Sequence, residues 1–377
     1  MSASLPRAEL VRLVERVFRP GPEDHRLALL VDLPDAKAAD HPAWSARREM
    51  VVEWQRSLQA DRDKLGLEEV RLIQYANVGR NNADLPEEAV VHESGEPVSF
   101  ESVFDAYQIL IAATEFSATA PLKLKAREHG FRAATMPGFQ ASMIPALQLD
   151  YEEIDRRCRD LKVVLDRAES AILRFEAEGI ERELHLDLRH RRATASGGLV
   201  REPGTAGNLP SGETYIVPYE GERPGDASRS HGVLPLELDG ELLAYRIERN
   251  RIVEVLGQGP RAAAERREVA AEPAYANVAE LGLGILGDYG VRPVGEILLD
   301  EKLGLHIAFG RSDHFGGSVG AQDFTSPERV VHIDRVYLPE VQPRVRVLAV
   351  DLEMVDDPER RRVPLMRDGR FVQESDV

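Results

Sequence analysis

The chain has 377 residues, of which 43% are hydrophobic and 30% are charged, a composition typical of a globular protein with more than one domain. Its 65 acidic and 48 basic residues give a formal net charge of −17, which argues against nucleic acid as a partner because nucleic-acid-binding proteins carry a basic footprint. The single cysteine, Cys158, excludes an intrachain disulfide and a cysteine-ligated zinc finger, and it fits a reducing compartment.

The N-terminal segment is predicted to be an amphipathic helix over residues 5–19, with charges of both signs. It lacks the uninterrupted apolar run of a signal peptide. The sequence also contains no run of about 18 apolar residues, so no membrane span is expected. These features predict a cytoplasmic protein that does not bind a membrane.

The first 150 residues alternate between apolar runs and amphipathic segments. Strands are predicted over residues 26–34, 69–78 and 131–138, and a strand, or a short helix running into one, over 104–115. Helices are predicted over residues 43–65 and 117–130, the second ending at a glycine. This alternation predicts an α/β N-terminal domain over residues 1–150 with an open, mostly parallel sheet.

A long amphipathic pattern follows over residues 151–179, where apolar side chains recur at helical spacing and Gly179 marks the end. We expect this segment to form one helix, and residues 151–180 to connect two domains. The prediction rests on periodicity alone.

From residue 181 onward the pattern becomes that of a β-rich α+β C-terminal domain, expected over residues 181–377. Residues 183–191 alternate strictly, and residues 234–256 resemble a meander with turns at 239–240 and 249–251. One short helix is predicted over residues 273–286. The charged tail after Leu352 is expected to form a strand pair or a loose end.

Acidic and imidazole side chains in this second half stand at positions that folding alone explains poorly. His332 and Asp334 are two residues apart in a strand-like segment, so they share one face. A buried carboxylate needs a cation or several hydrogen bonds, and a metal ion held by imidazole and carboxylate would supply the cation. Ordinary alternatives exist: Glu280 as an exposed helix charge, Glu213 in a turn, and His306 as a core histidine. The candidate metal ligands are Glu213, Glu280, His306, Asp313, His314, His332 and Asp334.

Four ordered blocks resemble the thermophilic-type metallo-aminopeptidases, the aminopeptidase T and S family. They read NLPSGETYIVP (208–218), NVAELGLGILGDYG (277–290), LLDEKLGLHIAFG (298–310) and HID (332–334). The resemblance covers residues 130–337 well and the N-terminal domain only in outline. It implies a homodimer of two-domain subunits with a pair of divalent metal ions, such as zinc, cobalt or manganese, in the C-terminal domain.

The resemblance also implies the ligands, carried over position by position as Glu213, Glu280, His306, His332 and Asp334. The family uses a tyrosine seven residues after its first ligand histidine, where this chain has Asp313 followed by His314. Either residue would replace the tyrosine as a ligand, or one metal position is altered. The chain is therefore expected to hold one or two divalent ions.

The activity implied is that of a metal-dependent hydrolase, aminopeptidase-like, which cleaves an amide or N-terminal peptide bond of a small peptide or small molecule. A metal-activated water would attack the carbonyl, and Glu213 or Glu280 would act as general base.

Two other functions stay open at this point. A related branch, similar to 2,5-dihydroxypyridine dioxygenase, uses mononuclear iron(II) and keeps the His-x-Asp pair, but has a histidine at the position of Glu280. Glu280 therefore favours the hydrolase, whereas the Asp313–His314 pair and the Gly316–Gly317 loop keep the dioxygenase as the alternative. The third possibility is a binding homologue that has lost catalysis.

Overall fold

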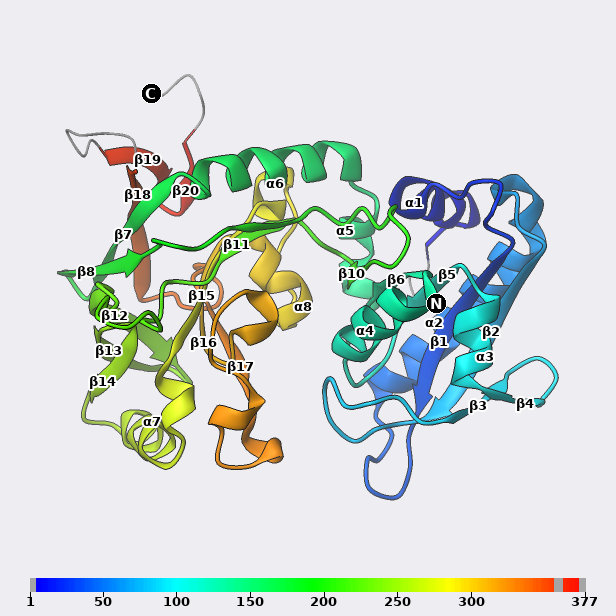
Figure 1. Cartoon of the computed structure of the whole chain (residues 1–377), viewed down its shortest axis with the longest axis horizontal. Helices are drawn as coiled ribbons and strands as arrows, with labels where there is room; N and C mark the ends of the chain where they lie inside the picture. Colours follow the sequence, from blue (N-terminus) through cyan, green and yellow to red (C-terminus); the bar gives the residue numbers. More distant parts are fainter. Residues whose placement is uncertain (1–4, 356–361, 373–377) are drawn as a thin grey trace. The chain divides into compact units, whose positions relative to one another are not determined.

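The computed structural model describes residues 5–355 and 362–372, and the chain divides into two compact units (Figure 1). The N-terminal unit comprises the residues up to Arg156 together with Ser196–Ser211. The C-terminal unit comprises Arg157–Ala195 and the chain from Gly212 onward. Among the described residues, no helix is both long and apolar enough to cross a membrane.

The N-terminal unit is built on a sheet with the strand order β10-β6-β5-β1-β2-β3-β4. From β10 to β2 neighbouring strands run parallel, whereas β3 and β4 add an antiparallel edge. The predicted open and mostly parallel sheet is thus confirmed, although β3 and β4 were not predicted. The strands are β1 (Arg26–Leu33), β2 (Glu69–Ala76), β3 (Glu88–Val91), β4 (Pro97–Ser99), β5 (Ile109–Ala112), β6 (Arg132–Thr135) and β10 (Ala206–Asn208).

Helices accompany this sheet. On one face, Ala28 and Leu30 of β1 join an apolar core with residues of α3 and α4. Helix α2 contacts β1 and β2, and α1 packs against α2. Helix α4 ends at Gly130, as predicted, and this glycine adopts the left-handed conformation, with a φ of 81°, that commonly ends helices. The helices are α1 (Arg7–Phe18), α2 (Pro42–Asp61), η1 (Arg62–Leu65), α3 (Phe100–Ala106), α4 (Thr119–His129), η2 (Ala141–Met143) and α5 (Ile144–Leu147). Helix α6 (Tyr151–Leu165) belongs to both units, which divide after Arg156.

The larger sheet of the C-terminal unit is antiparallel, with the order β14-β13-β12-β8-β7-β18-β19-β20. The predicted meander is confirmed: Asp239, Gly240, Arg249 and Asn250 all have positive φ, as two-residue hairpin turns of the primed type require. The strands are β7 (Ala168–Ala177), β8 (Ile180–Asp187), β12 (His231–Leu238), β13 (Glu241–Glu248), β14 (Arg251–Leu256), β18 (Val345–Met354), β19 (Arg362–Arg367) and β20 (Arg370–Phe371).

A second sheet has the order β17-β16-β15-β11-β9. The two sheets share one apolar core, to which Phe175 and Leu184 come from the larger sheet and Leu281 and Ile307 from the second. Since side chains alternate along a strand, the other face of the second sheet points away from this core. Its strands are β9 (Thr194–Ser196), β11 (Glu213–Ile216), β15 (Val278–Gly284), β16 (Leu305–Gly310) and β17 (His332–Val336).

Short helices connect these strands, and most have a single turn. They are α7 (Pro260–Ala271), η3 (Pro273–Ala276), η4 (Leu286–Tyr289), α8 (Ile297–Asp300), η5 (Glu301–Leu303), η6 (Asp313–Phe315), η7 (Ala321–Asp323) and η8 (Pro327–Arg329).

Two predicted helices are wrong in part. The helix predicted over 151–179 ends at Leu165, and Ala168–Ala177 forms β7 instead. The helix predicted over 273–286 is a single turn followed by β15. Strand β15 is buried at every position, and such a run cannot be told from a buried helix by periodicity. In β7, Ala168, Ile172 and Phe175 are buried and also recur at helical spacing, so they continued the pattern of the preceding helix.

Candidate metal centre

The second sheet gathers acidic and imidazole side chains on the face that points away from the shared core. Leu281 and Ile307 enter that core, so their neighbours Glu280 on β15 and His306 on β16 project to the opposite face. Ile216 of β11 and Ile333 of β17 also lie against the core. By the same alternation, Glu213 of β11 and both His332 and Asp334 of β17 project to the opposite face. The fold therefore brings together residues that are far apart in the sequence.

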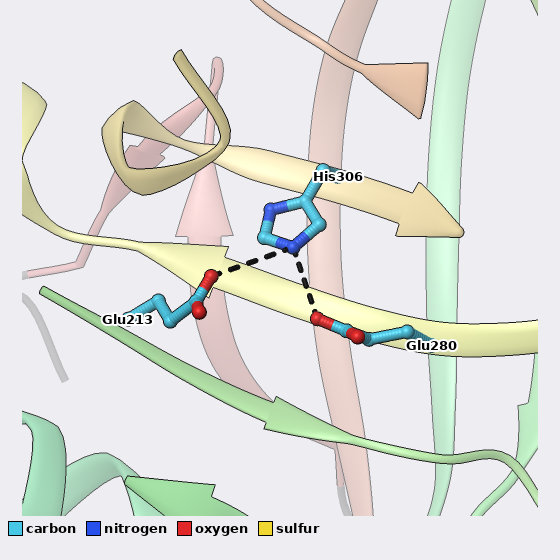
Figure 2. Close-up of side chains that lie close together, drawn as sticks. All are labelled: Glu213, Glu280 and His306. Atoms are coloured by element: carbon cyan, nitrogen blue, oxygen red, sulfur yellow. Dashed lines mark hydrogen bonds and ion pairs between the residues drawn. The ribbon is translucent and has the colours of Figure 1, made fainter. Parts of the chain in front are cut away.

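Three of these residues meet closely enough to hold one metal ion, as Figure 2 shows. The His306 imidazole lies between two carboxylates, with Nε2 3.1 Å from Glu280 Oε1 and 3.6 Å from Glu213 Oε2. One ligand atom from each residue lies within 4.8 Å of the others, and the three residues are at most 6% exposed.

His332 and Asp334 extend this group along β17. His332 Nε2 lies 3.3 Å from Glu280 Oε2 and 3.6 Å from Asp334 Oδ1. Its other ring nitrogen, Nδ1, is 2.8 Å from the carbonyl oxygen of Arg311 and donates to it. Glu280 therefore lies between two imidazoles, with one oxygen facing each.

A buried lysine and a third glutamate complete the cluster, and neither was predicted as a site residue from the sequence. Lys302 Nζ lies 2.6 Å from Glu213 Oε1 and also contacts Glu301 Oε1. The Lys302 side chain is only 2% exposed. Both residues belong to the block LLDEKLGLHIAFG, so their proximity to His306 in sequence was the available signal.

The charges of the centre depend on one another. Burial raises the pKa of Glu280, but its hydrogen bonds with His306 and His332 outweigh burial and lower the pKa to about 2. Burial lowers the pKa of His306, but Glu280, with help from Glu213 and Asp334, raises it to about 9. In the protein without metal, the carboxylates thus hold the imidazole in its protonated form.

Glu301 and Lys302 behave differently from this pair. Burial raises the pKa of Glu301 to about 8, because the nearby ammonium of Lys302 offsets burial only in part. Burial lowers the pKa of Lys302, but Glu213 and Glu301 reverse the effect and raise its pKa above the ordinary value. Lys302 is therefore a permanent buried cation.

The metal-free protein is expected to lose stability as the pH rises from about 6.5 to about 9. The fold stabilises the protonated form of His306, so this contribution is complete below its unfolded pKa and is lost through its folded pKa. The contribution of His306 to this loss is about 3 kcal/mol of unfolding free energy. Urea denaturation at a series of pH values measures it. His306→Gln should reduce the slope, to which the raised pKa values of Glu301 and His332 also contribute, and an unchanged slope in the variant would contradict the assignment.

The donor set fits a divalent metal ion. Glu213 Oε2 is buried and has no hydrogen-bond partner among the described residues, which is unfavourable unless a cation satisfies it. Imidazole with carboxylate is an ordinary ligand combination for zinc, manganese, cobalt and iron. Lys302 occupies the other oxygen of Glu213, so Oε2 is the atom that remains to bind.

Gly282 makes room for the His306 ring. It lies opposite His306 in the β15–β16 ladder, and a Cβ built on it would come within 1.9 Å of His306 Nε2. Any larger residue must therefore displace this imidazole from the two glutamates.

Gly282→Ala is expected to weaken metal binding by at least about tenfold, as displacement of a ligand or its support commonly does. Zinc affinity, measured by competition with a chromophoric chelator, tests this. Gly207→Ala is the matched control, because Gly207 also lies in a strand and a Cβ there meets nothing within 4 Å. Equal affinity in both variants would show that His306 is not a ligand.

The structure places Asp313 and His314 at the edge of this centre. The Asp313 carboxylate pairs with Arg311, with Nε 2.6 Å from Oδ1, and Asp313 is not part of the three-residue group. The His314 ring packs edge-on against His332, with 5.6 Å between ring centroids. Burial, with the charges of His332 and Arg311, lowers the pKa of His314 to about 4, so it is neutral near pH 7.

Comparisons with known proteins identify the fold. No family model matches the sequence, and no curated protein matches it. The structure of 2,5-dihydroxypyridine dioxygenase from Pseudomonas putida KT2440 matches with a TM-score of 0.62 and 14% identity, over 99% of both chains. Wild-type AmpT from Thermus thermophilus, an aminopeptidase T, matches with a TM-score of 0.56 and 17% identity, over 97% of this chain and all of that one.

Both structural neighbours are enzymes, and they represent the two branches that the sequence motifs predicted. At these identities the likeness concerns the fold. The chain therefore has the fold that an aminopeptidase T and a 2,5-dihydroxypyridine dioxygenase share, and it carries a buried Glu–Glu–His group able to bind a metal ion.

Proposed function

We propose that the protein is a metal-dependent hydrolase, aminopeptidase-like, that cleaves an amide or N-terminal peptide bond. The observation that supports this most is the arrangement around Glu280, whose two oxygens face His306 and His332 separately. A carboxylate placed in this way can bridge two neighbouring cation positions. Glu280 also distinguishes this chain from the iron branch, for which the resemblance implies a histidine here.

We assign the residues to two adjacent positions for divalent ions. Glu213, Glu280 and His306 would hold one, and Glu280, His332 and Asp334 the other. When bound, such ions lower the pKa of a water molecule and orient it for attack on a carbonyl. With neutral imidazoles, the carboxylates of these positions outnumber the buried cation Lys302, so the centre carries the negative charge that divalent ions require.

Glu213 is the group we assign to proton transfer. Lys302 holds its Oε1 at 2.6 Å, so only Oε2 remains to face the centre. With one lone pair of Oε2 directed to the ion, its other lone pair would accept the proton of the water and pass it to the leaving amine. Both oxygens of Glu280 contact imidazoles, and this favours Glu280 as a ligand. We further propose a small peptide or small molecule as substrate and a homodimer, as the family resemblance implies. We also propose a cytoplasmic location, on the basis of the single cysteine and the N-terminal sequence.

Metal reconstitution tests the proposal. The chelator-treated protein would be loaded anaerobically with zinc, cobalt, manganese or iron(II) and assayed on a panel of aminoacyl amides and dipeptides. Hydrolysis restored by zinc, cobalt or manganese is the expected result. Absence of hydrolysis with every ion, although the ions bind, would contradict it.

The iron(II) ring-cleaving dioxygenase is the second candidate. Two imidazoles, His306 and His332, face the single carboxylate of Glu280, and two histidines with one carboxylate are the ligands of non-haem iron oxygenases. Oxygen consumption by the iron(II)-loaded protein with 2,5-dihydroxypyridine would favour this function over hydrolysis.

A further inference from the structure

Glu220 is a buried carboxylate near the metal centre that is not one of the candidate ligands. It follows β11, and its side chain is 5% exposed. Five hydrogen-bond donors surround it. These are Ser312 Oγ at 2.5 Å, Asn277 Nδ2 at 2.8 Å, Ser318 N at 2.5 Å, Ser318 Oγ at 2.7 Å and Arg191 Nη2 at 3.2 Å.

Three of these five donors come from the two ends of one loop, residues 312–319. The loop closes on itself, since Ser312 N donates to Val319 O and Gly317 N donates to Ser312 O. Gly317 packs against this site so closely that a Cβ would lie 2.2 Å from Ser312 Oγ and 3.0 Å from Glu220 Oε1. The 312–319 loop is thus wrapped around the Glu220 carboxylate, and the glycine is needed for that contact.

The same loop, with the residue that precedes it, contacts the His332 ring. The carbonyl oxygen of Arg311, immediately before the loop, accepts the hydrogen bond from His332 Nδ1 at 2.8 Å. Within the loop, the Phe315 and His314 rings lie edge-on to the His332 ring, at centroid distances of 5.1 and 5.6 Å. These contacts fix the plane of the imidazole, and the Nδ1 bond leaves Nε2 to face Glu280 and Asp334.

We propose that Glu220 is a positioning residue, which fastens the 312–319 loop and thereby directs His332 Nε2 toward Glu280 and Asp334. The inference rests on the metal centre proposed above. Asn277, which donates to Glu220, immediately precedes β15, the strand of Glu280. The Glu220 carboxylate therefore contacts both the loop that supports His332 and the start of the strand that carries Glu280. Partners of ligand histidines commonly change metal affinity by about 10–100-fold when they are removed.

Glu220→Ala is expected to weaken the ion held by His332 about 10–100-fold, while the ion held by Glu213 and His306 is retained. Glu220→Gln should give an intermediate loss, because an amide can accept from Ser312 but not from both donors of Ser318. Glu222→Gln is the matched control, since Glu222 also pairs with Arg191 but has no bond to the loop.

Two measurements are needed. Cobalt(II) titration with chelator competition gives the affinity and number of ions. Nitrogen-15 correlation spectra of the imidazoles in the metal-free protein report whether His332 keeps the proton on Nδ1. We expect Glu220→Ala to broaden or shift the His332 signals and leave those of His306 unchanged.

The outcomes separate the two proposals. Wild-type protein that binds no ion overturns the metal centre, and the metal-free spectra then still test Glu220. A folded Glu220→Ala variant with wild-type affinity and wild-type His332 signals overturns the role of Glu220. If Glu220→Ala does not fold, Ser312→Ala replaces it, because it removes one bond to the carboxylate; an unchanged His332 signal in that variant would likewise overturn the inference.

Discussion

Glu280→Ala is expected to abolish metal binding and to lower kcat/KM by at least about 10³-fold, since Glu280 is the one residue shared by both proposed cation positions. Its removal also leaves His306 and His332 without the carboxylate between them. Metal content after dialysis and hydrolysis of the best substrate from the reconstitution panel would be measured together. His332→Ala should lose activity as well but keep the ion at Glu213.

Glu254→Ala serves as the control, because this exposed residue lies on β14 in the larger sheet and not in the sheet of the centre, and its partner among the described residues is Arg246. The variant proteins must melt cooperatively before their activity is compared. Wild-type turnover by folded Glu280→Ala in the presence of metal would show that the ligand assignment is wrong.

Lys302→Met is expected to cost about 3–5 kcal/mol of unfolding free energy in the metal-free protein, the usual effect of removing one partner of a buried ion pair. The substitution keeps most of the side-chain volume but leaves the Glu213 carboxylate without its cation and the Glu301 carboxyl, whose pKa is raised, without the Lys302 ammonium. Urea denaturation, followed by circular dichroism, gives the difference from wild type.

A divalent ion should restore part of this stability, because it supplies the positive charge that the variant lacks. Lys64→Met is the control. Lys64 also pairs with a carboxylate, but its side chain is 65% exposed, so the substitution should leave the free energy of unfolding nearly unchanged. If Lys302→Met were as stable as wild type, the carboxylates around it would have to be protonated or solvated, and the charge balance proposed for the centre would be wrong.

Part of the candidate site could be predicted from the sequence because strand periodicity is local. His332 and Asp334 were expected to share a face from their spacing alone, and they do. Glu213, Glu280 and His306 are also brought together, but their selection depended on the family resemblance. Nothing local indicates that residues 213, 280 and 306 become neighbours, since this follows from the pairing of β11, β15 and β16.

The elements that were predicted wrongly have a common physical reason. The segment that carries Glu280 is a strand whose residues are all buried, so it lacks the alternation that would distinguish it from a helix. Most elements of the parallel sheet in the N-terminal unit were predictable because helices and strands alternate there with clear turns. Lys302 and Glu220 were missed because a charged residue a few positions before a strand, or after one, is more often exposed.

The strand order of the second sheet has a consequence for folding kinetics. Strands β11, β15, β16 and β17 are neighbours in that order in the ladder of this sheet, and the proposed ligands that they carry, Glu213, Glu280, His306 and His332, lie 67, 26 and 26 residues apart in the sequence. Closing such long loops costs entropy before any contact rewards it, so this ladder forms slowly compared with local hairpins. In the unfolded chain the proposed ligands are separated, so no high-affinity metal site exists there. During refolding, high-affinity metal binding should therefore appear with the late formation of this ladder and not with the early collapse of the chain.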